Sequence, residues 1–67
     1  MALFQVKIWY VSGTYEEVNN APAGTARTIY AEARDSDRVE AAELHGAATH
    51  KLYESCRGGV DTTPSVG

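Results

Sequence analysis

The chain has 67 residues and a net charge of −3, so we expect one small domain at most. Its single cysteine, Cys56, excludes a disulfide within the monomer. The six lysines and arginines are scattered, which argues against a nucleic-acid-binding face, and no apolar run approaches the roughly 18 residues of a membrane span.

Residues 3–11 show the alternation of a β-strand. One side of this strand carries the apolar residues Phe4, Val6, Ile8 and Tyr10. Trp9 and Lys7 fall on the other side, which should be the wetter one. Because this second side is also partly apolar, we expect a loop or another subunit to cover it.

A long loop is predicted over residues 12–24. Gly13 favours a turn, and Pro22 lies in a segment rich in Asn, Ala and Gly. Residues 15–18 fit either a short strand or a loop. The whole connection is longer than a usual hairpin loop of about two to five residues.

Residues 25–33 are predicted to form a second strand, antiparallel to the first, since consecutive strands are usually neighbours. Ile29 and Ala31 share one face of this strand, and Tyr30 lies on the other. The polar residues 35–37 that follow carry side-chain oxygens suited to the start of a helix.

Residues 36–56 are predicted to form one C-terminal helix. At about 100° per residue, Leu44, Ala48 and Leu52 fall within one broad arc of mostly small or apolar residues. The glycines at 58 and 59 are interpreted as the helix end. Residues 60–67 are interpreted as a C-terminal tail, which alone would be disordered.

These elements predict an α+β fold: a small ββα unit in which an antiparallel hairpin packs on one C-terminal helix, within a single domain over residues 1–59. A chain of this size buries only about 60% of the surface that its unfolded state exposes. A hairpin also leaves unpaired edges. We therefore expect an oligomer or a partner to complete the unit.

No residue spacing indicates catalytic, cofactor or metal chemistry. On the predicted helix His45 and His50 would project about 140° apart, so they would not share one ion. His45 lies within the apolar arc, where a hydrogen-bonded core histidine is the usual explanation; a ligand-binding role is the alternative. We expect no enzyme activity, no metal and no cofactor.

Aromatic side chains are the main functional indication. Trp and Tyr contribute much of the binding energy at protein interfaces. The predicted interface consists of Trp9, Tyr15, Tyr30 and Lys7. The alternative is that these aromatic residues pack under the protein's own long loop.

The sequence therefore predicts a small, non-enzymatic interaction protein that binds a protein partner or itself as a homo-oligomer, without nucleic acid, membrane or metal. It would be a subunit of a larger assembly or an accessory or inhibitor protein of the phage type, cytoplasmic or virion-associated. The alternative is a small oligomer with a ligand-binding or catalytic site between subunits, around His45 or Tyr15.

Overall fold

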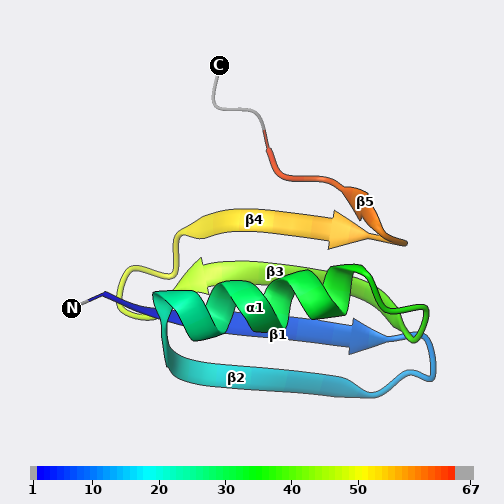
Figure 1. Ribbon diagram of the computed structural model, residues 1–67, viewed down its shortest axis with the longest axis horizontal. Helices are drawn as coiled ribbons and strands as arrows, with labels where there is room; N and C mark the ends of the chain where they lie inside the picture. The colour runs from blue at the N-terminus through cyan, green and yellow to red at the C-terminus, as the bar shows by residue number, and fades with distance from the viewer. Residues whose placement is uncertain (1, 65–67) are drawn as a thin grey trace.

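The structure is a computed structural model that describes residues 2–64. In these residues one helix packs against one face of a five-stranded antiparallel sheet (Figure 1). The elements are β1 Leu3–Tyr10, β2 Tyr15–Pro22, α1 Ala23–Arg34, β3 Val39–Gly46, β4 Leu52–Arg57 and β5 Val60–Asp61. The strand order is β2-β1-β3-β4-β5. The predicted α+β class, with a helix packed on antiparallel strands, is confirmed.

Strand β1 lies where the alternation predicted it, but its neighbours are different. It pairs with β2 on one side and with β3 on the other. Val6 and Ile8 are buried on the face that α1 covers. Of the loop predicted over residues 12–24, the turn at Gly13, with φ 94°, is present and leads directly into β2. The strand alternative for residues 15–18 is the correct one, and the loop assignment of residues 19–22 is wrong.

The predicted second strand over residues 25–33 is wrong, because this segment lies in α1. Ala26, Tyr30 and Ala33 are its buried residues, and their spacing is that of one helix face. The alanines, Arg and Glu of this segment also favour helix. Pro22, with φ −60°, directly precedes the first turn, where its missing N–H removes no helical hydrogen bond.

The predicted helix over residues 36–56 is also wrong, because β3 and β4 form a hairpin there. Ala and Glu in β3 favour helix locally, but this strand is central in the sheet. Ala42 and Leu44 are fully buried beneath α1, and Ala41 is buried on the opposite face. Burial between two strands therefore outweighs the local helical preference.

The polar residues 35–37 follow a helix end and do not begin a helix. The backbone N–H of Asp35 donates to the carbonyl of Ala31 at 3.1 Å, as in a last helical turn. The Ser36 hydroxyl then accepts a hydrogen bond from the backbone N–H of Arg38 at 3.2 Å. Side chains of this type cap helix starts and also stabilise turns, so the local signal fits both structures.

Strand β5 replaces the start of the predicted tail. Gly58 and Gly59 have φ values of 59° and 80°, which suit a two-residue hairpin turn between β4 and β5. The backbone N–H of Thr62 donates to the carbonyl of Ser55 at 2.9 Å and extends this pairing. Of the predicted tail, residues 65–67 lie outside the described residues.

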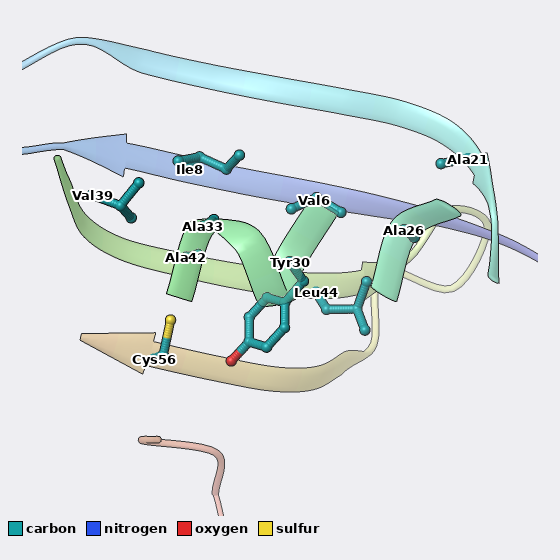
Figure 2. Packing of buried hydrophobic residues seen from close by; sticks show 10 residues of the cluster. All are labelled: Val6, Ile8, Ala21, Ala26, Tyr30, Ala33, Val39, Ala42, Leu44 and Cys56. Atoms are coloured by element: carbon teal, nitrogen blue, oxygen red, sulfur yellow. The ribbon is translucent and has the colours of Figure 1, made fainter. Parts of the chain in front are cut away.

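The hydrophobic core lies between α1 and the sheet (Figure 2). Its buried residues are Val6, Ile8, Ala21, Ala26, Tyr30, Ala33, Val39, Ala42, Leu44 and Cys56. The ring of Tyr30 extends from α1 towards Leu44 and Cys56. Small side chains on α1 and on β3 let the helix lie close to the strands, which a densely packed interior requires.

Replacing Leu44 by alanine should lower the free energy of unfolding by about 2–5 kcal/mol, because the side chain is fully buried and its loss leaves a cavity. Val11→Ala is the matched control, since Val11 is 65% exposed. Its effect should stay within about 0.5 kcal/mol. Denaturant unfolding measures both, and equal effects would contradict the packing of β3 beneath α1.

Two glycine substitutions should have opposite effects on stability. Gly24→Ala should raise the free energy of unfolding by up to about 1 kcal/mol, because Gly24 lies in α1 and its new Cβ meets no atom within 4 Å. Gly58→Ala should lower it by about 1–2 kcal/mol, since φ is 59° there. Thermal or denaturant unfolding checks the signs, and a destabilised Gly24→Ala variant would argue against the start of α1.

Candidate protein-interaction site

The second face of the sheet points away from α1, and no element of residues 2–64 covers it. We call it the uncovered face. The strand register places its side chains in three rows across the strands. The first row is Tyr15, Trp9, Ala41, Arg57 and Val60, the second is Glu17, Lys7, Glu43 and Ser55, and the third is Gln5, His45 and Leu52.

Trp9 and Tyr15 meet on this face as a cross-strand aromatic pair. Their ring centroids lie 5.3 Å apart with the planes tilted by 48°. Trp9 is half-buried, and Tyr15 is 46% exposed. On the other side of Trp9, Ala41 is the buried floor of a hollow of about 130 Å³, which Arg57 also lines. Trp9 therefore supports an exposed tyrosine at one side and a shallow hollow at the other.

Hydrogen bonds hold the carboxylate of Glu17 beside this pair. The Tyr15 hydroxyl donates to Glu17 Oε2, and Gln5 Nε2 donates to Glu17 Oε1 at 2.8 Å. Together with the side chain of Asn19 and the charge of Lys7, these contacts hold the pKa of Glu17 below its usual value, the bond from Tyr15 having the largest effect. The carboxylate is thus a fixed negative charge.

The phenol of Tyr15 is stabilised in its neutral form. Partial burial of the side chain is the main cause, followed by the hydrogen bond to Glu17 and by the negative charges of Glu17 and Glu43. These effects raise the pKa of Tyr15 to about 12. At neutral pH the residue therefore presents an uncharged ring edge and a hydroxyl already engaged as a donor.

Lys7 lies in the second row between two carboxylates. The register places it opposite Glu17 on β2 and opposite Glu43 on β3. Its side chain is half-buried, one row from the aromatic pair. The structure thus brings three of the predicted interface residues, Trp9, Tyr15 and Lys7, onto neighbouring positions of one face.

Tyr30 does not join them. It was predicted on a strand face, but α1 turns it into the core, where only 3% of it is exposed. Burial raises the pKa of its phenol well above the ordinary value, with a further contribution from the neighbouring Cys56 thiol. Its assignment to an exposed interface is therefore corrected. The helical spacing of Ala26, Tyr30 and Ala33 was the signal for this position.

His45 lies on the uncovered face of β3, not on a helix. Its Nε2 is 2.6 Å from Glu43 Oε1, and its Nδ1 is 3.3 Å from the carbonyl oxygen of His50. Both ring nitrogens therefore have partners within the chain, and 13% of the side chain is exposed. These contacts account for the position of His45 structurally, and its ligand-binding role stays a prediction.

The described residues contain neither a metal-binding cluster nor a helix that could span a membrane. Within residues 2–64, no three side chains of the His, Cys, Asp and Glu types are grouped so that they would hold a metal ion. No helical segment in the same range has both the length and the apolar character that a membrane span requires.

Sequence reasoning left residues 15–18 open between strand and loop and did not predict a strand that reaches Pro22. The structure places Glu16 and Glu17 on opposite faces of β2, opposite Ile8 and Lys7. The available signal was the Gly13 turn directly after a clear strand, which indicates that the next residues return beside it.

Comparison with known proteins identifies no relative. No family model matches this chain, and no match is found among curated proteins or solved structures. Function is therefore inferred from the surface itself.

Glu17→Gln should lower the pKa of Tyr15 from about 12 towards the ordinary 10, because it removes a charged hydrogen-bond acceptor. Tyr15 contributes stability below about pH 10, and this contribution is lost as the pH rises through about 12, since the folded-state pKa is the higher one.

An NMR titration of the tyrosine rings measures this shift. Glu16→Gln is the matched control, because Glu16 accepts from the Tyr10 hydroxyl at 2.8 Å and raises the pKa of that residue instead. Each substitution should therefore move its own tyrosine. If Glu17→Gln left Tyr15 unchanged, the contact between these two side chains would be wrong.

Proposed function

We propose that this protein is a small, non-enzymatic interaction protein that binds another protein through the uncovered face, around Trp9, Tyr15 and Lys7. The observation that carries the proposal is the Trp9–Tyr15 pair, with ring centroids 5.3 Å apart, on a face that no described element covers. Rigid aromatic side chains of this kind give large contact area at low entropic cost and are enriched among interface hot spots.

The surroundings of the pair support a macromolecular partner. Aromatic contact area lies at Trp9 and Tyr15, and the charged side chains of Lys7, Glu17 and Arg57 lie beside it on the same face. A central apolar patch with a polar rim is the usual anatomy of a protein interface. The hollow beside Trp9 holds only about 130 Å³, well below the roughly 300–1,000 Å³ of small-molecule pockets.

Two roles of this kind are proposed: a subunit of a larger assembly, and an accessory or inhibitor protein of the phage type. Both would use the same surface, since a subunit contact and an inhibitory contact have the same physical requirements. The identity of the bound protein distinguishes them.

Site-specific photo-cross-linking tests the proposal. Benzoylphenylalanine in place of Tyr15 should give a discrete protein adduct in the producing cells, whereas the same group at Thr28, exposed on α1, should not. Trp9→Ala should reduce the adduct about tenfold or more, because hot-spot aromatics contribute about 2 kcal/mol or more.

The fold of each variant is checked by its NMR spectrum. If Trp9→Ala unfolds, Tyr15→Ser serves in its place, and binding of the purified variant to the identified protein is measured by calorimetry. Tyr15 is 46% exposed, so its loss should leave the fold intact. Equal adducts from both positions, or full binding by the folded variants, would refute an interface at this pair.

A further inference from the structure

We infer that the partner supplies an extended, basic segment that adds to the sheet as a new strand beside β2. This inference rests on the proposed function and names the chemistry of the partner. It is carried by three features: the free backbone of β2, the acidic side chains on both of its faces, and a hollow on its helix-covered side.

Strand β2 is an edge strand whose outer backbone groups have no partner strand within residues 2–64. The Tyr10 N–H donates to the Thr14 carbonyl at 2.9 Å, which sets the phase of the β1–β2 ladder. In an antiparallel ladder, alternate residues bond to the same neighbour. Glu16 therefore bonds to β1, while the N–H and C=O groups of Tyr15 and Glu17 point outwards, ready to accept another strand.

The charge along this edge is negative on both faces. The sequence of β2 is YEEVNNAP, with two acidic side chains and no basic one. Glu17 points to the uncovered face beside Tyr15, and Glu16 points to the helix-covered face opposite Ile8. A strand added here would thus meet a carboxylate whichever way its side chains point.

A hollow of about 310 Å³ lies next to Glu16 on the helix-covered side. Its apolar lining includes Ile8 and Ile29, and its two charged residues, Glu16 and Glu32, are both acidic. Figure 1 shows why there is room: α1 runs over β1 and β3, and β2 projects beyond it. A lysine or arginine fits this hollow, with its aliphatic stem on the isoleucines and its charge at the carboxylates.

The alternation of side chains along β2 also determines where the neighbouring side chains of the added strand would lie. A residue opposite Glu16 would enter the hollow, and the residues on either side of it would point to the uncovered face. There they would lie beside Tyr15 and Glu17, next to the aromatic pair. Edge addition and contact with the uncovered face are therefore parts of one interface.

Charge argues against a second copy of this chain as the occupant. Opposite residues in an antiparallel pair point to the same face, so a two-fold pairing of β2 places like residues close together. Centred on Glu16 or Glu17, it sets that carboxylate directly against its own copy. Any centre nearby still gathers four carboxylates at one edge, whereas a basic strand neutralises them.

An NMR titration with synthetic peptides tests the inference. The probe is an eight-residue peptide of alternating lysine and valine, which matches the eight residues of β2. The control has glutamate in place of lysine. The lysine peptide should bind, slow hydrogen exchange at the amides of Tyr15 and Glu17, and lose affinity as salt rises. The glutamate peptide should neither bind nor slow this exchange.

Three variants distinguish the contribution of side-chain charge from that of backbone hydrogen bonding. Glu16→Gln with Glu32→Gln should weaken the lysine peptide about threefold or more, because two ion pairs are lost. Glu17→Pro removes an outward N–H without breaking the ladder to β1, which a proline tolerates at an edge. It should weaken binding more than Glu17→Gln, which removes the same charge and keeps the N–H.

Several outcomes would overturn the inference. They are equal binding of both peptides, unchanged exchange at Tyr15 and Glu17, and equal affinities of Glu17→Pro and Glu17→Gln. Protection of these amides that rises with protein concentration alone would assign the edge to a second copy. Cross-linking from Tyr15 that persists in Glu17→Pro and is lost in Trp9→Ala would retain the proposed function while rejecting strand addition.

Discussion

The packing of α1 against the centre of the sheet is the constraint on which the rest of this fold depends. Tyr30 reaches from the helix towards Leu44 and Cys56, and the neighbouring core positions are small enough for a close approach (Figure 2). A helix is about 10 Å wide, roughly the width of two strands. Over β1 and β3 it covers β2 only near Ala21 and Val18, which leaves open the hollow between Glu16 and Glu32. The exposed edge is thus a direct result of how the core is built.

The sequence predicts those segments whose own pattern is decisive, and it fails for those whose structure depends on pairing with distant strands. β1 was predicted because its alternation of large apolar and polar residues is strong. β3 was not, because its alanines and glutamates favour helix until β1 and β4 bury them. The segment of α1 shows the reverse error: Ile29, Ala31 and Ala33 alternate, yet the buried set repeats with helical spacing. Small residues fit both periods, so long-range packing decides between them.

The candidate site was predicted only in part, because strand pairing, and not the local sequence, brings its residues together. Trp9 and Tyr15 were identified separately, as aromatic residues outside the expected core, and the register of the β1–β2 hairpin brings them together. Tyr30 was included only because its segment was interpreted as a strand. The edge of β2, with Glu16 on one face and Glu17 on the other, required a strand that composition does not indicate. Acidic and Asn residues are poor strand formers, and β1 supplies the ladder that holds them in place.

The order of the pairings also has a consequence for how the chain folds. The β1–β2 and β3–β4 hairpins each close over a short stretch of sequence, whereas the β1–β3 ladder joins Phe4 to Gly46. Closing so long a loop costs more chain entropy than closing either hairpin. The 12 residues of α1 reduce this cost, since a formed helix spans about 18 Å and delivers β3 to the far end of β1. We therefore expect two local hairpins to form early and their docking, guided by the helix, to set the folding rate.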